Sequence, residues 1–420
     1  MPAKGQGGIR GFLRAFGPGI VTGAADDDPS GVATYSVAGA GLGTSLLWTA
    51  ALTWPLMATV QMMCARIGMV TGGGLAGAMR KKFPKWLLAA FAGGLLIANT
   101  INIASDLAGM ADAAEMLTGW NSHWFVVPFG VAIAWATVRL RYHQIAMILK
   151  WLALFLFAYV ITAFYVGPDW MEVAKVALLP SQPTGKEWWG ALVAILGTTI
   201  SPYLFFWQAG QEVEEEKAMG RRMLVQRVGA SPKEITTRKL DVGIGTFFSN
   251  LVMFFIILTT ALTLHRHGIT HIETSRQAAE ALSPLAGKFA ALLYTVGIIG
   301  VGFLAIPTLS GSAAYAFAET FRWREGLDLK LRSARYFYGV VIVSTAAGIA
   351  LDFAKVNPIR ALYWTAILNG LLAPFLLIGI LLVASDQKLM AGQPSSRLSR
   401  VVVAITTLFM FAAAAGMFLV

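Results

Sequence analysis

The sequence has few charged residues for its length. Only 13% of its 420 residues are Asp, Glu, Lys or Arg, whereas soluble globular chains carry about 25%. A single cysteine, Cys64, excludes a disulfide framework and a cysteine metal cluster. The connections between apolar runs are too short to hold a soluble domain. These deficits exclude an ordinary soluble enzyme or binding module.

What the chain has instead is apolar length. Hydrophobic residues make up 56% of it, and they gather in runs near the roughly 20 residues that a bilayer-spanning helix needs. We therefore expect an all-α polytopic membrane protein, a single domain over residues 1–420 with about 11 transmembrane helices. The expected spans are 17–41, 46–70, 86–117, 124–138, 146–167, 188–211, 241–264, 281–318, 335–351, 359–384 and 400–420.

The basic residues indicate how the chain crosses the membrane. Most of the 33 Lys and Arg residues fall in alternate connections, with a concentration between 217 and 239. The positive-inside rule then predicts a cytoplasmic N-terminus and a C-terminus outside. The first 14 residues lack the apolar run of a signal peptide, so we expect a cytoplasmic tail. The net charge of +11 follows from this topology, and nucleic acid is not needed to explain it.

Three consecutive acids interrupt the first apolar run. Between Arg14 and Arg66 the charged residues are Asp26, Asp27 and Asp28, followed at once by Pro29-Ser30-Gly31. Carboxylates at membrane depth are costly and usually mark an ion or substrate path. Proline and glycine should break the helix there, and broken backbone is tolerated at that depth where it lines a cavity or is buried in protein.

The sixth run carries a second break, Gly197-Thr198-Thr199-Ile200-Ser201-Pro202-Tyr203. First and sixth helices correspond in a five-plus-five inverted repeat, and paired interrupted helices point to a transporter site. We expect repeat one at about 15–167, repeat two at about 188–384 and an extra helix at about 400–420. The plainer alternative is that each proline only kinks its helix.

These motifs resemble the Nramp family of divalent-metal transporters. Asp28-Pro29-Ser30-Gly31 is similar to the family's Asp-Pro-Gly-Asn, and Ser201-Pro202-Tyr203 falls where the family has Met-Pro-His. Ser105-Asp106-Leu107-Ala108-Gly109 resembles the family's Asp-Leu/Ile-Ala-Glu. The resemblance implies a LeuT-type fold with broken helices 1 and 6. It also implies secondary transport of a divalent cation toward the cytoplasm, in a divergent branch similar to the Nramp-related magnesium transporters.

The departures from the family pattern bear on the ion. The family's metal aspartate corresponds to Asp28, its asparagine to Gly31 and its methionine to Ser201. Oxygen ligands suit Mg²⁺, Ca²⁺ and Mn²⁺, whereas thioethers suit softer metals, and two lost side-chain ligands should leave room for a partly hydrated ion. Successive helical residues lie about 100° apart, so the three acids cannot all face one ion. The candidate metal residues are Asp28, Asp27, Ser201, Thr198 and Ala25, the last two through their carbonyls.

The resemblance also bears on coupling. The family's sixth-helix histidines correspond to Tyr203 and Gln208, and its third-helix glutamate to Gly109, so Asp106 is the titratable group that remains. We expect weak or no proton coupling. The membrane potential alone would drive a divalent ion by ~4.6 kcal/mol per 100 mV, at ~2.3 per elementary charge.

Other polar residues are candidates for the translocation path. They are Asp26, Gly31, Tyr203, Asn102, Asp106, Gln208, Glu212 and Asn369. Structural explanations stay open for several of them. The asparagines could form hydrogen bonds between helices, and the acidic run 212–216 could be a solvated helix face.

Competing functions are a transporter of organic cations or amino acids on the same fold and a transporter-derived membrane sensor. An intramembrane enzyme is disfavoured, because the acids are contiguous and lack a catalytic partner at membrane depth. We expect no enzyme activity, no cofactor besides the transported divalent cation and no obligate protein partner. The expected location is the bilayer of a bacterial inner membrane.

Overall fold

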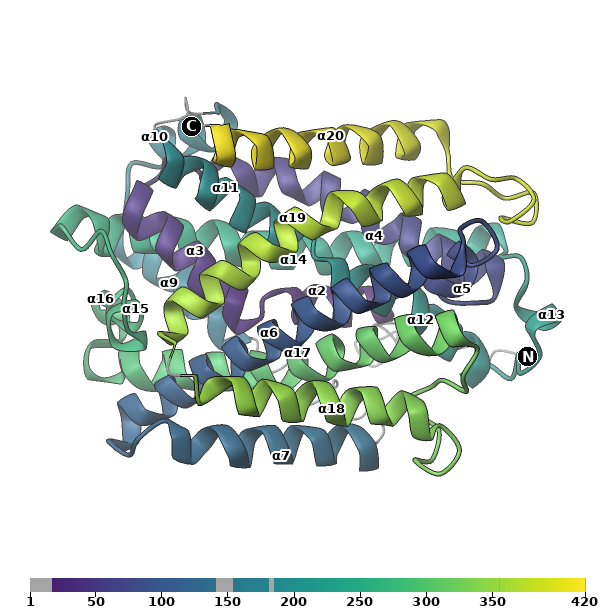
Figure 1. Ribbon diagram of the computed structural model, residues 1–420. Helices are drawn as coiled ribbons and strands as arrows, with labels where there is room; N and C mark the ends of the chain where they lie inside the picture. The colour runs from purple at the N-terminus through teal and green to yellow at the C-terminus, as the bar shows by residue number, and fades with distance from the viewer. Residues whose placement is uncertain (1–16, 141–153, 181–184, 355, 420) are drawn as a thin grey trace, which may run out of the picture.

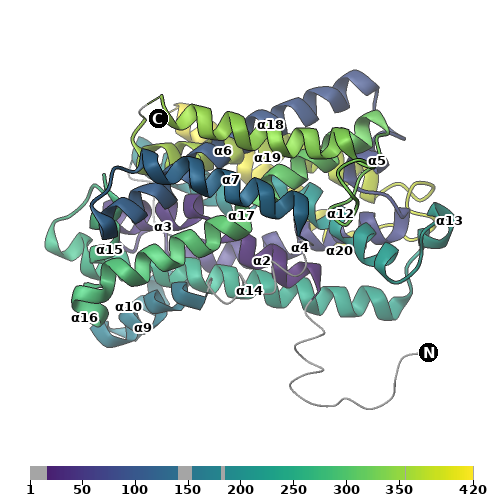
Figure 2. The same ribbon diagram turned by 90° about the horizontal axis from the view of Figure 1, so that it is seen from below.

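The computed structural model describes residues 17–140, 154–180, 185–354 and 356–419. Within them the chain is a bundle of helices that run roughly parallel to one long direction (Figures 1 and 2). The longer helices are α2 (Pro18–Asp26), α3 (Pro29–Leu42), α4 (Trp48–Thr71), α6 (Lys85–Thr118), α7 (His123–Arg139), α9 (Phe157–Val166), α11 (Lys186–Thr199), α12 (Pro202–Ala218), α14 (Pro232–Thr263), α17 (Ala290–Phe321), α18 (Arg335–Asp352), α19 (Pro358–Ala384) and α20 (Arg397–Leu419).

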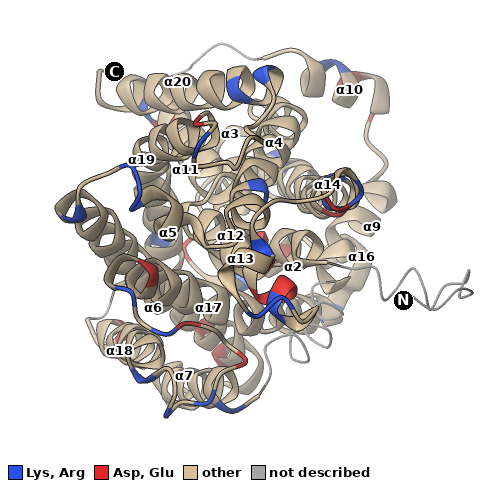
Figure 3. Cartoon of the chain, turned by 90° about the vertical axis from the view of Figure 1, so that its right-hand side faces the viewer, with Lys and Arg blue, Asp and Glu red and all other residues tan. Residues whose placement is uncertain are grey.

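Short elements complete the connections. They are α5 (Leu75–Met79), η1 (Leu154–Leu156), α10 (Trp170–Leu178), α13 (Leu224–Arg227), η2 (His265–His267), α15 (Ser275–Glu280), α16 (Ser283–Ala286) and η3 (Gly287–Phe289). Lys and Arg residues lie around the end of the bundle that carries α5 and α13 (Figure 3). That end is the one to which the positive-inside rule assigns the cytoplasm.

Both predicted helix breaks are present. The first lies between α2 and α3, where Asp27 ends α2 and Asp28 caps α3. Pro29 is the first residue of α3, a position at which proline loses no hydrogen bond. The second lies between α11 and α12, at Ile200 and Ser201, with Pro202 again opening the next helix. The prolines therefore start new helices and do not kink continuous ones.

The expected spans mostly coincide with helices. Among the described residues, six helices are long and apolar enough to cross a membrane. One boundary was wrong. α14 begins at Pro232, well before 241, because Ser231 and Glu234 form a capping box there. The eighth span runs over Ser283–Phe321, close to the expected 281–318, and consists of the short turns α16 and η3 followed by α17. The first part of the fifth expected span, 146–153, lies outside the described residues.

Packing places the two breaks at the centre of the bundle. α2 and α3 lie along α14, α11 lies along α19, and α6 packs against α17 and α18. α20 lies on the outside, against α19 and α11 (Figure 1). The broken helices are thus enclosed by continuous ones, which is the condition under which irregular backbone is tolerated at membrane depth.

Candidate functional site

Asp28 sits in the first break and faces the third and sixth spans. Its side chain is buried, and its Oδ1 accepts a hydrogen bond of 2.6 Å from the backbone N–H of Gly31, which fixes it as the N-cap of α3. Its Oδ2 accepts from Asn102 Nδ2 at 3.3 Å and from the Tyr203 hydroxyl at 3.4 Å. The second oxygen therefore points to the place where α3, α6 and α12 meet.

Asp26 and Asp27 turn the other way, toward α14. The Ser249 hydroxyl lies 2.6 Å from Asp26 Oδ2 and 3.3 Å from Asp27 Oδ1. Both carboxylates are buried, and Asp26 Oδ1 accepts no hydrogen bond within the described residues. None of the Lys, Arg and His residues that the structure describes forms an ion pair with these acids or with Asp28. A buried carboxylate without a positive partner favours a proton or a bound cation.

The second break supplies carbonyl groups close to the first. The Ser201 hydroxyl donates back to the carbonyls of Gly197 at 2.6 Å and Thr198 at 2.9 Å. The Tyr203 hydroxyl donates to the Ala25 carbonyl at 3.0 Å, which joins the end of α2 to the start of α12. Carbonyls at the ends of half-helices are the groups that coordinate cations in broken-helix transporters. The two carbonyls predicted as metal ligands, those of Thr198 and Ala25, therefore accept hydrogen bonds from the hydroxyls of Ser201 and Tyr203.

The space expected at Gly31 is not open. A Cβ added there would lie 3.0 Å from Thr198 Oγ1, 3.2 Å from the Asp26 carbonyl and 3.4 Å from Asp28 Oδ1. The hydroxyl of Thr198 thus fills the position that a larger residue at 31 would take. The expectation of a roomy site was wrong at this point, and Thr198 can contribute a hydroxyl as well as its carbonyl.

The third span carries two predicted residues, and one of them contacts Asp28. Asn102 donates to it, and its own Oδ1 is buried without a hydrogen bond among the described residues. Asp106, four positions further along α6, is fully buried, and neither of its carboxylate oxygens has a hydrogen-bond partner within the described residues. Asn99 of the same span instead donates to the carbonyl of Leu309 and to Ser312, which are hydrogen bonds between α6 and α17.

Gln208 and Glu212 lie further along α12 than Tyr203, toward the C-terminal end of that helix. The Thr22 hydroxyl donates to Gln208 Oε1 at 2.7 Å, and Gln208 Nε2 donates to Glu212 Oε1 at 2.7 Å. Glu212 is 1% exposed and pairs with Arg238. The solvated-face reading is therefore wrong for Glu212, which belongs to the protein interior.

Asn369 is not brought to the aspartates by any hydrogen bond. It is buried in α19, and its Oδ1 has no partner within the described residues. Its neighbour Gly370 packs against Gly197, so this part of α19 borders the second break. Asn369 stays a prediction for the path.

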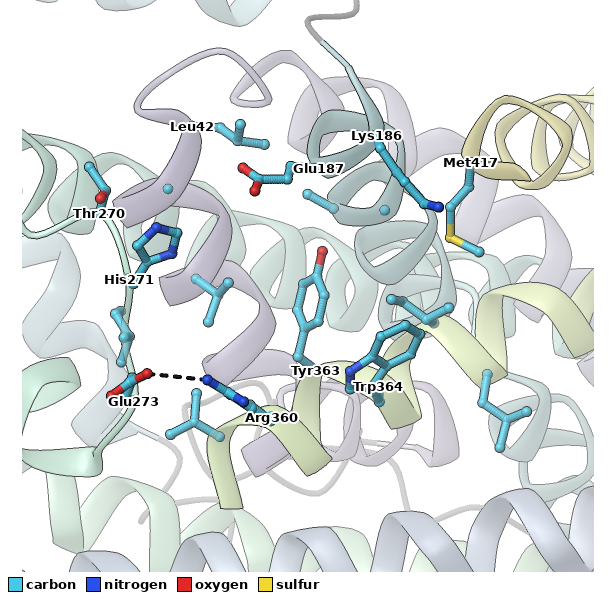
Figure 4. A pocket seen from close by; sticks show the side chains of 18 of the residues that line it. Leu42, Lys186, Glu187, Thr270, His271, Glu273, Arg360, Tyr363, Trp364 and Met417 are labelled. Carbon is cyan, nitrogen blue, oxygen red and sulfur yellow. Dashed lines mark hydrogen bonds and ion pairs between the residues drawn. The ribbon is translucent and has the colours of Figure 1, made fainter. Parts of the chain in front are cut away.

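A large cavity lies at the opposite end of the bundle from α5. Its volume is about 1360 Å³, and α3, α11, α19, α20 and the 270–273 loop line it. Figure 4 shows Glu187, Tyr363 and the Arg360–Glu273 ion pair around it. None of the candidate metal residues lines this cavity. It borders the outer halves of both broken helices, α3 and α11, without reaching the breaks.

No three His, Cys, Asp or Glu side chains gather as a ready-made metal cluster in the part of the chain that is described. A site at the breaks would therefore combine carboxylate, hydroxyl and carbonyl oxygens. Sequence reasoning missed Ser249, Arg238 and Asp241. The polar pair Ser249-Asn250 within an otherwise apolar seventh span was the available signal for the first of these.

Comparison with known proteins supports the same reading. The model of the Nramp family, described as natural resistance-associated macrophage protein-like, matches residues 19–420. The divalent metal cation transporter MntH of Caldanaerobacter subterraneus subsp. tengcongensis is 24% identical over 417 residues, 94% of this chain and 91% of that protein. MntH of Yersinia pestis is 27% identical over 309 residues, 71% of each chain.

Solved structures show the fold. A manganese transporter of Eremococcus coleocola, in complex with an aromatic bis-isothiourea substituted compound, superposes with a TM-score of 0.73 at 17% identity. The match covers 98% of this chain and 87% of that one. Mhp1, a nucleobase-cation-symport-1 family transporter, superposes with a TM-score of 0.57 at 15% identity, covering 96% and 92% of the two chains. The five-plus-five arrangement with broken first and sixth helices is the fold that these neighbours share.

Proposed function

The chain belongs to the Nramp family, and from that premise we propose that it carries a divalent metal cation across a bacterial inner membrane, toward the cytoplasm. The MntH proteins of Caldanaerobacter subterraneus and Yersinia pestis bear the name divalent metal cation transporter. The proposed ligands centre on Asp28, with Thr198, the Ala25 carbonyl and Ser201 at the facing break and Asp27 as a second carboxylate.

One observation carries this proposal: a buried carboxylate stands in a helix break without a positive partner. Within the described parts of the chain, the hydrogen-bond donors to Asp28 from Gly31, Asn102 and Tyr203 are all neutral. Transferring an ionised carboxylate from water into a protein interior costs several kcal/mol unless it is paired. A transported cation supplies that pairing for part of the cycle, and its departure restores the cost, so the ion can be held and then released.

The donor chemistry favours a hard ion, Mg²⁺ or Mn²⁺. Ser201 stands where the family has a methionine, and the groups nearest Asp28 that could bind a metal are oxygens. Hydroxyl, carbonyl and carboxylate oxygens suit these cations, and a thioether would favour softer ones. The oxygen ligands, and not free space beside Gly31, favour these ions, because Thr198 fills that position.

Transport with weak or no proton coupling is the second part of the proposal. Tyr203 and Gln208 occupy the histidine positions, and both donate hydrogen bonds, Tyr203 to the Ala25 carbonyl and Gln208 to the Glu212 carboxylate. At Gly109, an added Cβ would meet Leu362 Cδ1 at 2.9 Å, so the family's glutamate position is closed by leucine. Asp106, buried four positions beyond Asn102 on α6, is the remaining candidate for a proton carrier.

The test is metal flux into proteoliposomes with a panel of Mg²⁺, Mn²⁺, Ca²⁺ and Zn²⁺. Saturable influx of Mg²⁺ or Mn²⁺, driven by an imposed inside-negative potential, supports the proposal. Exclusive uptake of an organic cation or an amino acid would favour the competing transporter function, and binding without flux would favour a sensor.

A further inference from the structure

A buried arginine lies at the base of the first helix. Arg238 of α14 is 7% exposed and contacts three carboxylates. Its Nε lies 2.8 Å from Glu212 Oε2, its Nη1 lies 2.5 Å from Asp241 Oδ2, and its Nη2 contacts Glu215. Two of these acids belong to α12 and one to α14, so a single guanidinium joins the two helices. We refer to Arg238, Glu212, Glu215 and Asp241 as the arginine hub.

The hub also holds the start of α2. Asp241 accepts hydrogen bonds from the backbone N–H groups of Gly17 at 3.0 Å, Gly19 at 2.8 Å and Ile20 at 3.3 Å. The first N–H groups of a helix have no intrahelical acceptor and carry the positive end of its dipole. No side chain of the N-cap residue itself, Gly17, serves them. Asp241 thus caps α2 from another helix, and Arg238 fixes the rotamer of Asp241.

Glycines allow α2 to pack closely against α14 on the N-terminal side of the first break. A Cβ at Gly19 would lie 2.6 Å from the backbone nitrogen of Val242, and one at Gly23 would collide with the backbone of Gly245. The two helices therefore touch backbone to backbone along one side of α2. On its other side, Val21 and Ala25 pack against a cluster that contains Trp207, Leu304 and Tyr315.

A chain of hydrogen bonds links the hub to α2, one turn before the break. Arg238 binds Glu212, Glu212 accepts from Gln208, and Gln208 accepts from Thr22 of α2. Ala25, one turn further along α2, contributes its carbonyl to the break. A cation that leaves the breaks toward the α5 end meets Glu212 as its next carboxylate, and there it meets the guanidinium of Arg238.

We propose that Arg238 is the positioning residue that closes the release path, by locking the first half of the broken helix α2 onto α12 and α14. The inference deepens the proposed function and rests on it for its role in transport. Opening this end requires α2 to move away from the aspartates, which breaks the Asp241 cap. A departing divalent ion favours this opening, because it competes with the Arg238 guanidinium for binding to the Glu212 carboxylate.

Replacing Arg238 should weaken the closed arrangement of α2. Removing one partner from a buried ion cluster leaves the others uncompensated, which is strongly unfavourable. In Arg238→Gln, Glu212 and Asp241 would be buried without their cation, and water entering from the α5 end would relieve the cost. The closed arrangement is therefore weakened relative to one in which α2 has swung out.

The experiment measures access to α2 and needs no transport. Val21→Cys in a Cys64→Ser background gives a single thiol on the packed face of α2. Its labelling rate with a charged, membrane-impermeant thiol reagent is compared in otherwise identical proteins that carry Arg238 or Arg238→Gln. Arg221→Gln is the matched control, because Arg221 forms its ion pairs with Glu216 and Glu234, neither of which belongs to the arginine hub.

We expect Arg238→Gln to raise the labelling rate of Val21→Cys about tenfold, and Arg221→Gln to leave it unchanged. Adding Glu212→Gln to Arg238→Gln should lower the rate again, because it removes one uncompensated charge. Arg238→Lys, which cannot hold three carboxylates at once, should fall between wild type and Arg238→Gln.

Two results would overturn the proposal. One is an equal rate in the Arg238→Gln and Arg221→Gln proteins. The other is faster labelling of the buried Cys64 when Arg238→Gln is made in the protein that keeps Cys64 and Val21, which would mean general loosening of the fold. Failure of the proposed function is distinguishable: flux would be absent for every metal while the labelling contrast persists.

Discussion

Replacing Ser201 by methionine and Gly31 by asparagine together should shift transport from Mg²⁺ toward Mn²⁺. The double substitution places a thioether at the second break and an amide beside Asp28. Thioether sulfur is a soft ligand, so it stabilises Mn²⁺ more than Mg²⁺, and an added ligand displaces water that Mg²⁺ gives up reluctantly. A shift of about tenfold in the Mn²⁺/Mg²⁺ flux ratio corresponds to ~1.4 kcal/mol of differential binding.

The structure sets the cost of this change. Ser201 loses its hydrogen bonds to the carbonyls of Gly197 and Thr198, a loss of about 1 kcal/mol. The larger methionine adds an overpacking cost of about 1–3 kcal/mol. At position 31 the new Cβ stands 3.0 Å from Thr198 Oγ1, so this hydroxyl must move by a few tenths of an ångström. Thr198→Ala added to the double variant removes the obstruction.

The assay is competitive flux into proteoliposomes with both metals present, for wild type, each single variant, the double variant and the version with Thr198→Ala. Size-exclusion and thermal melting profiles establish that each protein is folded. A folded double variant that binds metal and keeps the wild-type Mn²⁺/Mg²⁺ ratio, with and without Thr198→Ala, would refute the hard-ligand argument.

Three other outcomes are expected. Metal influx under an imposed potential should leave an interior pH dye unchanged, since Tyr203, Gln208 and Gly109 cannot carry protons at neutral pH; acidification that tracks metal concentration and disappears in Asp106→Asn would contradict this. Ser249→Ala should lower stability by about 1–3 kcal/mol, because it removes the donor shared by the buried Asp26 and Asp27, and an unchanged thermal midpoint would count against that contact. Burial raises the pKa of Glu325, in the loop before α18, from 4.5 to about 7; the folded state then holds its proton more tightly than the unfolded state, so stability falls as pH rises from about 4.5 to about 7. Glu325→Gln should flatten this dependence between pH 5 and pH 8 in thermal melts, and a variant whose melting profile follows wild type over that range would show that Glu325 is not responsible.

The backbone of the site was predictable because its signals are local. Pro29 and Pro202 each disfavour the helical conformation in the residue before them, and each starts the next helix. The acids beside the first proline could be assigned to a break because nothing else in that span is charged. These features depend on neighbours in the chain, which a single sequence displays.

The partners of those acids were not predictable, because they come from distant segments. Ser249 reaches Asp26 across 223 positions, and the polar pair Ser249-Asn250 marks its span without indicating Asp26 as its partner. Glu212 looked like part of a solvated acidic run, and it is buried because Arg238 neutralises it from the start of another helix. The filling of the space at Gly31 by Thr198 likewise depends on how two breaks meet.

The central claim is that Asp28 binds the transported ion. The most direct measurement is Mg²⁺ and Mn²⁺ influx into proteoliposomes that contain wild type, Asp28→Ala, Asp28→Asn or Asp386→Asn. The control removes a carboxylate that pairs with Lys82, away from the breaks. The account predicts that both Asp28 variants insert and fold but lose saturable flux of either metal, while Asp386→Asn retains it. Wild-type flux in a folded Asp28→Ala protein would contradict the assignment of the site.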